Sequence, residues 1–137
     1  MRLICIIVGL ISMLGCTMRS PKVVQLDIYA SVACGTCTDL LNQLWDRKDY
    51  AGADRVRIIV RDGGEADVAT MRARIPANCL NRVDVIPDAD RALFHKRAEK
   101  GIPRMVLYVN SSEVGEWIGK NKENLPNIYE MTKKYHG

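Results

Sequence analysis

Two cysteines separated by two residues place the strongest constraint on the fold of this chain. Cys34, Gly35, Thr36 and Cys37 form a CGTC motif. The run 23–29 before the motif roughly alternates apolar and polar residues, which is typical of a strand, and apolar residues recur at helical spacing after it. The motif is therefore predicted to lie at the beginning of a helix that follows a strand.

Cys34 is predicted to be a nucleophilic thiol and Cys37 its partner. The first turn of a helix has unpaired N–H groups and the positive end of the helix dipole, and both lower the pKa of a thiol placed there. Cys37 lies one turn further along, close enough to attack a mixed disulfide at Cys34 and release the attached molecule. Half of a zinc site is the alternative. Such a site would need a second pair of ligands at comparable spacing. The remaining cysteine and histidines, Cys79, His95 and His136, are each isolated in the sequence.

The first 15 residues have the layout of a secretion signal. The run 3–14 is almost wholly apolar and follows a basic residue. It is too short to span a membrane comfortably, because a membrane-spanning helix needs about 20 residues. The residues before Cys16 resemble the bacterial lipoprotein signal, although Met13 stands where that signal usually has leucine. The resemblance implies removal of residues 1–15, lipidation of Cys16 and a polar tether over 16–22. The alternatives are cleavage that leaves the cysteine free, and an uncleaved anchor.

Length and charge favour one domain without a nucleic-acid partner. About 120 residues would remain after processing, which is enough for one core. The net charge is +4, and the basic residues are scattered among acidic ones. A nucleic-acid interface would gather them on one face, so nucleic-acid binding is disfavoured. Dithiol chemistry requires neither a metal ion nor a nucleotide, and no cofactor is expected.

The rest of the pattern predicts an α/β domain, a mixed sheet with helices on both faces. Strands are predicted at 23–29, 54–60, 83–86, 105–109 and 114–118. Helices are predicted after the motif, over 65–74, from about Asp88 to Lys100, and from Asn124 onward, with Asn124 as the cap of the last helix. Early strands separated by helices pair in parallel, and the two closely spaced later strands form an antiparallel hairpin.

Taken together, these features resemble the thioredoxin superfamily. The similarity rests on the CGTC motif after the first strand, the Ile102-Pro103 pair before a buried strand, the hairpin and the closing helix. It implies a thioredoxin-like domain over 23–137 whose middle segment, 63–100, is longer than in a minimal thioredoxin. It also implies a cis peptide bond before Pro103 and a place beside the dithiol, where Ile102 and Pro103 bind an extended substrate. A proline at the start of an ordinary strand is the alternative.

Several positions depart from the thioredoxin pattern. Ala33 stands where thioredoxins have tryptophan, and Thr36 stands where they have proline. The buried acid of their first strand corresponds to Ile28, whereas the acid here is Asp27, one position away and therefore on the opposite face of the strand. Cys79 lies in the longer middle segment, either as a buried apolar residue or as a third redox thiol.

The expected function is thiol–disulfide exchange with protein clients in a bacterial cell envelope. Cys34 and Cys37 would be catalytic, with Gly35 and Thr36 as the inner residues of the motif. A lipid on Cys16 would hold the domain at a membrane surface, facing the periplasm. The alternative is a non-catalytic subunit of an envelope secretion or conjugation assembly, in which the disulfide only stabilises the fold. Whether the protein oxidises, reduces or isomerises the disulfides of its client is left open by the sequence.

Overall fold

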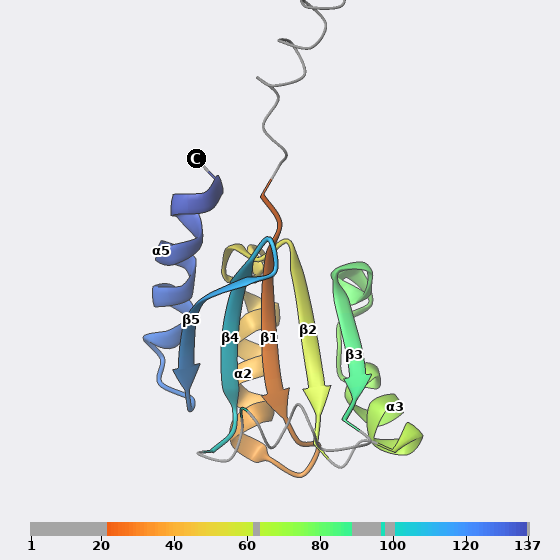
Figure 1. Ribbon diagram of the computed structural model, residues 1–137. Helices are drawn as coiled ribbons and strands as arrows, with labels where there is room; N and C mark the ends of the chain where they lie inside the picture. The colour runs from red at the N-terminus through yellow and green to blue at the C-terminus, as the bar shows by residue number, and fades with distance from the viewer. Residues whose placement is uncertain (1–21, 62–63, 89–96, 98–100, 137) are drawn as a thin grey trace, which may run out of the picture.

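The computed structural model describes residues 22–61, 64–88, 97 and 101–136 (Figure 1). The elements in these ranges are, in chain order, β1 (Val24–Ala30), α2 (Gly35–Asp46), η1 (Tyr50–Gly52), β2 (Arg55–Val60), α3 (Glu65–Ala73), η2 (Ala77–Arg82), β3 (Val83–Pro87), β4 (Arg104–Val109), β5 (Ser112–Ile118) and α5 (Asn124–His136). The predicted signal, 1–15, and all of the predicted tether except Lys22 lie outside the described residues. Within them, no helix has both the length and the apolar character needed to span a membrane.

The strands form one sheet in the order β3-β2-β1-β4-β5. β1, β2 and β3 are parallel, because a helix, α2 or α3, carries the chain back along the sheet between successive strands. β4 pairs antiparallel with both β1 and β5. Asn110 and Ser111, between β4 and β5, have positive φ angles of 49° and 70°, which match the two-residue turn of a twisted hairpin. The predicted mixed sheet with a C-terminal antiparallel hairpin is confirmed.

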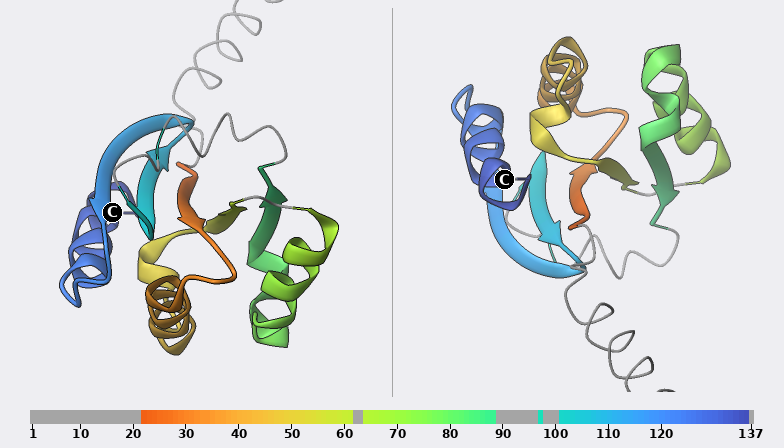
Figure 2. Two further views of the ribbon diagram at one scale, coloured as in Figure 1. Left: turned by 90° about the horizontal axis from the view of Figure 1, so that it is seen from below. Right: turned by 90° about the horizontal axis from the view of Figure 1, so that it is seen from above.

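α2, α3 and α5 pack against one face of this sheet (Figure 2). Successive residues of a strand point to opposite faces, so every second side chain of each strand contacts the helices. The large residues buried here are Leu26, Ile28, Ile58, Met105 and Leu107 from the strands, and Leu40, Leu44, Met71 and Ile128 from the helices. Burial of each contributes about 1.5–3 kcal/mol. This core holds α2, which begins within the CGTC motif, firmly against the sheet.

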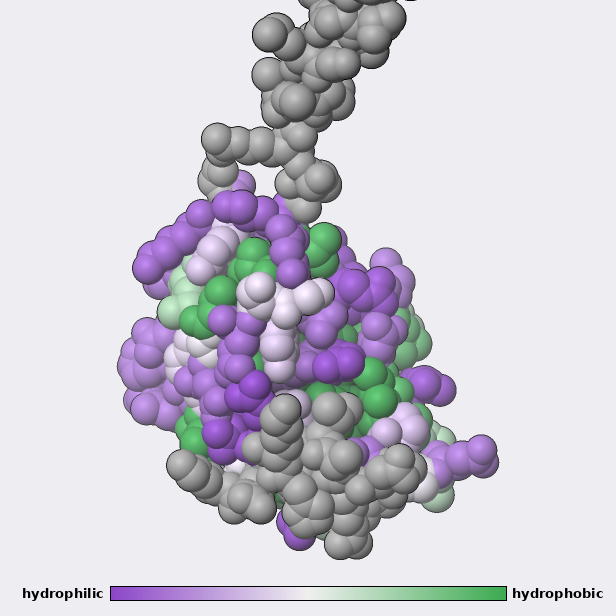
Figure 3. Space-filling view, viewed as in Figure 1, coloured by the Kyte–Doolittle hydropathy of each residue, from purple (hydrophilic) through white to green (hydrophobic). Residues whose placement is uncertain are grey.

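The opposite face combines a small apolar cluster with ion pairs. Tyr29, Ile59 and Val106 are buried there. Asp27 is also fully buried, and its carboxylate accepts hydrogen bonds from Nε and Nη2 of Arg57 at 3.0 and 2.5 Å. Figure 3 looks onto this face and shows hydrophilic residues over much of its described part.

Most of the predicted elements are confirmed. All five predicted strands are present, with ends that differ by at most two residues. The middle segment, 63–100, supplies α3, η2 and β3, which adds an edge strand beside β2. The helix predicted from about Asp88 to Lys100 falls outside the described residues except for Asp88 and Arg97. Helices were predicted on both faces of the sheet, whereas α2, α3 and α5 all pack against the same face.

The predicted role of Asn124 as a helix cap is wrong. Asn124 is the first residue of α5 and is buried. Its side-chain Nδ2 donates hydrogen bonds to the carbonyl oxygens of Ile118 and Gly119 at 3.3 and 2.9 Å. The amide of Asn124 therefore joins α5 to the end of β5. Just before α5, it is Asn121 whose Oδ1 accepts a hydrogen bond from a backbone N–H, that of Glu123, at 3.0 Å.

Candidate active site

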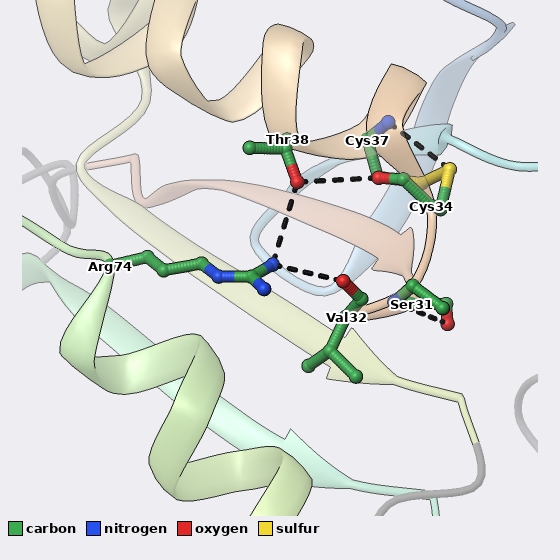
Figure 4. Close-up of a disulfide and its surroundings, with 7 residues drawn as sticks. Ser31, Val32, Cys34, Cys37, Thr38 and Arg74 are labelled. Carbon is green, nitrogen blue, oxygen red and sulfur yellow. Dashed lines mark hydrogen bonds between the residues drawn. A yellow bond between two sulfur atoms is a disulfide. The ribbon is translucent and has the colours of Figure 1, made fainter.

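The CGTC motif lies at the N-terminus of α2, directly after β1. β1 ends at Ala30, and the chain turns at Ser31, whose carbonyl oxygen accepts a hydrogen bond from the Cys34 N–H at 3.1 Å. Cys34 is the N-cap residue of α2 and has an extended backbone, with φ −87° and ψ 104°. Cys34 and Cys37 form a disulfide with their Cα atoms 5.2 Å apart (Figure 4). The predicted placement of the two cysteines at the start of a helix is confirmed.

The two cysteines differ in exposure. Cys34 is half-buried, whereas Cys37 is fully buried in the core. The Cys37 N–H donates a hydrogen bond to the Cys34 Sγ at 3.1 Å. In the reduced protein this donor and the helix dipole would favour a thiolate at Cys34. Cys34 is therefore the more exposed of the two cysteines.

The inner residues of the motif are open to solvent. Gly35 and Thr36 are both exposed, and a Cβ atom built at Gly35 would have no other atom within 4 Å. Ala33, which precedes the motif, is exposed as well. The sequence neighbours of Cys34 in the motif are therefore small and exposed.

The loop before β4 lies beside the end of β1 that leads to the motif. Antiparallel pairing aligns Tyr29 with Arg104, and this brings Pro103 next to the C-terminal end of β1. The Ile102–Pro103 peptide bond is cis, as predicted. Pro103 is buried and its carbonyl oxygen accepts a hydrogen bond from the Gly119 N–H at 2.8 Å, while Ile102 is half-buried. The sheet thus brings the disulfide and the Ile102-Pro103 pair to the same end of the molecule.

Two cations that the sequence analysis did not identify lie beside the first turns of α2. Arg74, which follows α3, donates from Nη1 to the Val32 carbonyl oxygen at 3.1 Å and to the Thr38 hydroxyl at 3.4 Å. Lys120 forms an ion pair with Asp39 at 2.7 Å. These partners are separated by 36 to 81 residues in the sequence, so no local pattern indicates them.

Asp27 lies on the face of the sheet opposite α2, as its position in the strand predicted. The hydrogen bond from Arg57 to Asp27 is the main reason why the pKa of Arg57 is raised. Burial, followed by the neighbouring Tyr108 and Asp27, raises the pKa of Tyr29 to about 12. Asp27 is therefore held in an ion pair on the far side of the sheet, and no step at the disulfide is assigned to it.

Cys79 is a buried core residue at the other end of the sheet. It is only 3% exposed, and its hydrogen bond with Tyr50 is the main cause of the raised pKa of that tyrosine. Cys79 precedes the first residue of β3, whereas Cys34 follows the last residue of β1, and both strands run parallel to β2. The prediction of a buried apolar role for Cys79 is confirmed, and in this fold its sulfur lies far from the disulfide.

The structure also bears on the zinc alternative for the motif. Within the described part of the chain, no three side chains of His, Cys, Asp or Glu are grouped closely enough to hold a metal ion. The sulfurs of Cys34 and Cys37 are bonded to each other, whereas zinc is bound by thiolates.

Solved structures with a similar fold are thioredoxin-like proteins. A candidate thioredoxin from Neisseria meningitidis matches with a TM-score of 0.60 and 15% identity, over 82% of this chain and 75% of that one. StoA from Bacillus subtilis matches with a TM-score of 0.57 and 18% identity, over 80% and 84% of the two chains. A secreted disulfide oxidoreductase from Mycobacterium tuberculosis, homologous to DsbE of Escherichia coli, matches with a TM-score of 0.56 and 16% identity, over 79% and 81%.

The fold is therefore thioredoxin-like, with a CxxC pair at the N-terminus of the helix that follows β1. At these low identities the likeness defines the fold and leaves the activity to be argued from the site. No protein-family model matches the sequence, and a search of curated proteins finds no significant match.

Proposed function

We propose that the protein is a thiol–disulfide oxidoreductase that acts on protein clients through Cys34 and Cys37. The observation that carries this proposal is the asymmetry of the disulfide, in which a half-buried cysteine at a helix N-terminus is bonded to a fully buried one. A nucleophilic thiol must be accessible and acidified, and a resolving thiol must be close but protected from outside reagents. A disulfide that only braced the fold would need neither difference.

The proposed exchange proceeds in two steps that balance. In the reducing direction the Cys34 thiolate attacks one sulfur of a client disulfide, forms a mixed disulfide, and releases the other client sulfur as a thiolate. The Cys37 thiolate then attacks Cys34 Sγ, forms the Cys34–Cys37 disulfide and releases the second client thiolate. Two electrons pass from the dithiol to the client. The oxidising direction is the reverse, and the relative reduction potentials of protein and client set the direction.

Ile102 and Pro103 are proposed to bind the client chain beside Cys34. They lie at the same end of the sheet as the disulfide, and Ile102 is half-buried, so part of its surface is open to a bound peptide. Ile118, which is 46% exposed, is the closest neighbour of a Cβ atom built at Gly101, at 3.9 Å, so it adds apolar surface next to this loop. The exposed Gly35 and Thr36 would border the client on its other side.

The activity is tested with purified protein, a peptide disulfide that carries a fluorescence reporter, and dithiothreitol as electron donor. We expect turnover with the wild type and with Cys79→Ala, because Cys79 lies at the other end of the sheet. We expect no turnover above the donor alone with Cys34→Ser. Equal turnover in the wild type and Cys34→Ser would refute the enzymatic proposal. In a separate experiment, Cys37→Ala produced in cells should accumulate the mixed disulfide, and mass spectrometry of the trapped adduct would identify the client.

A non-catalytic subunit of an envelope secretion or conjugation assembly is the rival function, and a reduction potential separates the two. Structural disulfides of exported proteins typically have potentials below about −300 mV. We expect the Cys34–Cys37 couple to lie above this value, because a thiolate at Cys34 is stabilised in the reduced form. A lower potential, together with assembly into a large complex that does not change in a Cys34→Ser/Cys37→Ser variant, would favour the rival.

The protein is further proposed to act in the bacterial cell envelope, attached to a membrane surface by lipid on Cys16. The signal-like run 3–14 supports export, and an exported location supplies the oxidising conditions in which disulfides persist. Labelling of growing cells with a fatty-acid analogue tests the attachment. We expect label in the wild type and in Cys5→Ala, since Cys5 lies in the predicted signal, and none in Cys16→Ala. An unlabelled wild type would contradict the lipid anchor.

A further inference from the structure

Arg74 connects the middle segment of the chain to the residues on both sides of Cys34 (Figure 4). Its Nη1 donates to the carbonyl oxygen of Val32, two residues before Cys34, and to the hydroxyl of Thr38, four residues after it. We infer that Arg74 is a positioning residue for the dithiol, whose guanidinium charge stabilises the Cys34 thiolate. The inference rests on the proposed function.

The contacts of Arg74 form a chain of donors that ends at Cys34. Thr38 Oγ1 accepts from Arg74 and donates its own hydrogen to the Cys34 carbonyl oxygen at 3.3 Å. The Thr38 N–H donates to the same carbonyl oxygen at 3.1 Å, as part of the first turn of α2. Each of these groups presents its positive end toward the N-terminus of α2. The charge of Arg74 therefore adds to the field of the helix dipole at the place where the thiolate forms.

Another pair of charges lies beside this turn. Asp39 and Lys120 form an ion pair at 2.7 Å, so their opposite charges largely cancel. Arg74 is exposed, and its guanidinium donates to Val32 and Thr38, which bracket Cys34 in the sequence.

Arg74 also gives the longer middle segment a direct link to the proposed chemistry. It follows α3, an element that lies between β2 and the edge strand β3 in the chain. The guanidinium spans from the end of α3 to α2 and its preceding loop. This segment therefore does more than enlarge the sheet, because it supplies a charge beside the nucleophile.

The test measures the pKa of Cys34 in the reduced protein from the pH dependence of its alkylation by iodoacetamide. The variants are Arg74→Met, Arg74→Lys and, as a matched control, Arg72→Met, which removes the same charge from an exposed position of α3. For Arg74→Met we expect a rise of about half a pKa unit, a modest size because the charge is exposed and screened by solvent and salt. This rise corresponds to about a threefold smaller thiolate fraction at neutral pH.

The Cys34 pKa of Arg72→Met should match that of the wild type. The Cys34 pKa of Arg74→Lys should lie between those of the wild type and Arg74→Met, because lysine keeps the charge. The reduction potential of Arg74→Met should move to a more negative value, since a less stable thiolate disfavours the reduced form. A Cys34 pKa that is the same in Arg74→Met, Arg72→Met and the wild type would overturn the inference. So would a Cys34 pKa in Arg74→Lys equal to that in Arg74→Met.

Two features keep the result interpretable. Denaturant unfolding of each oxidised variant shows whether it is folded, so a change in Cys34 pKa is not confused with loss of structure. Alkylation needs no client, so a wild type that fails to exchange disulfides refutes the proposed function, whereas an unchanged pKa refutes the role of Arg74. The two failures are therefore seen in different measurements.

Discussion

Single residues decide which chemistry the two faces of the sheet can support. The face that carries α2 presents Cys34, with Cys37 buried beneath it, and the other face buries the carboxylate of Asp27. Asp27 accepts from both Nε and Nη2 of Arg57, and Gln25 Nε2 donates to the same carboxylate at 2.9 Å. All of these hydrogen bonds lie on the second face, so the sheet separates the Asp27 carboxylate from the two sulfurs. The carboxylate contributes to stability through its pair with Arg57.

We expect Asp27→Asn to lower the free energy of unfolding by about 2–4 kcal/mol. Removing one partner of a buried ion pair leaves the other charge without compensation, and Arg57 is only 32% exposed. Asp84→Asn is the matched control, because Asp84 pairs with Arg55 while both side chains are half exposed, and its loss should cost less than about 1 kcal/mol. Denaturant unfolding measures both, and equal losses would contradict the buried character of the Asp27 pair.

Tyr29 makes stability fall at alkaline pH. Its pKa is raised from 10.0 to about 12, chiefly by burial, so the folded state keeps the phenol proton over a range in which the unfolded chain loses it. The stabilisation is complete below pH 10 and is lost as the pH rises toward 12. Between pH 10 and 11 we expect a loss of about 1 kcal/mol from this group.

The measurement is denaturant unfolding at pH 9, 10 and 11, on the wild type and on Tyr29→Phe. The phenylalanine variant keeps the ring but cannot ionise, so its stability should fall less steeply than that of the wild type. Parallel pH profiles for the two proteins would show that Tyr29 does not carry the effect.

Among the elements, α5 is bound by hydrogen bonds to a short turn, η1, that was not predicted from the sequence. In η1 the residues Tyr50, Ala51 and Gly52 all have positive φ, at 50°, 53° and 85°. This geometry brings the Ala51 and Gly52 carbonyl oxygens to α5, where the Thr132 hydroxyl and His136 Nε2 lie within hydrogen-bonding distance, at 3.3 and 2.7 Å. The turn thus joins the end of α2 to the last helix of the fold.

We expect Gly52→Ala to destabilise the protein by more than about 2 kcal/mol. A Cβ atom at this position would overlap the buried Thr132 hydroxyl, and the φ of +85° is unfavourable for alanine. Gly35→Ala serves as the control, because nothing lies within 4 Å of its Cβ and alanine favours the first turn of α2. Thermal unfolding compares the two, and similar midpoints would contradict close packing between η1 and α5.

Elements with a regular pattern could be predicted, and contacts that depend on distant residues could not. The alternation in β1 and the spacing of Leu40 and Leu44 are local, so the strand, the helix and the motif between them followed from the sequence. Tyr50 and Ala51 adopt a left-handed backbone, and neither residue type indicates this conformation. Arg74 is one of many basic residues, and only the fold places it beside the motif.

In the whole molecule, the chain enters the sheet at the end opposite the disulfide (Figure 1). Val23 and Asn110 fix the entry point, because the Val23 N–H donates to Asn110 Oδ1 at 2.8 Å and the Asn110 N–H donates to the Val23 carbonyl oxygen at 2.9 Å. The seven residues of β1 then span about 23 Å before the chain turns toward Cys34. An attachment through the N-terminus would therefore leave the disulfide facing away from the surface.

We expect the protein to keep its full exchange activity when it is immobilised through a biotin acceptor peptide placed ahead of Lys22. The same peptide inserted after Asn121 should reduce the activity of the immobilised protein several-fold, because this turn adjoins α2 through the Lys120–Asp39 ion pair. Activity of each protein in free solution is the control for folding. Equal activities on the support would contradict the proposed orientation.

If the chain is attached through Cys16, as proposed, the same placement of the entry point would make the residues between Cys16 and Lys22 a spacer. Each residue inserted there would widen the radius over which Cys34 can meet a membrane-associated client by up to about 3.5 Å, without altering any contact of the folded domain. The set of disulfides within range of a surface-bound form could thus evolve through spacer length alone, independently of the sulfur chemistry.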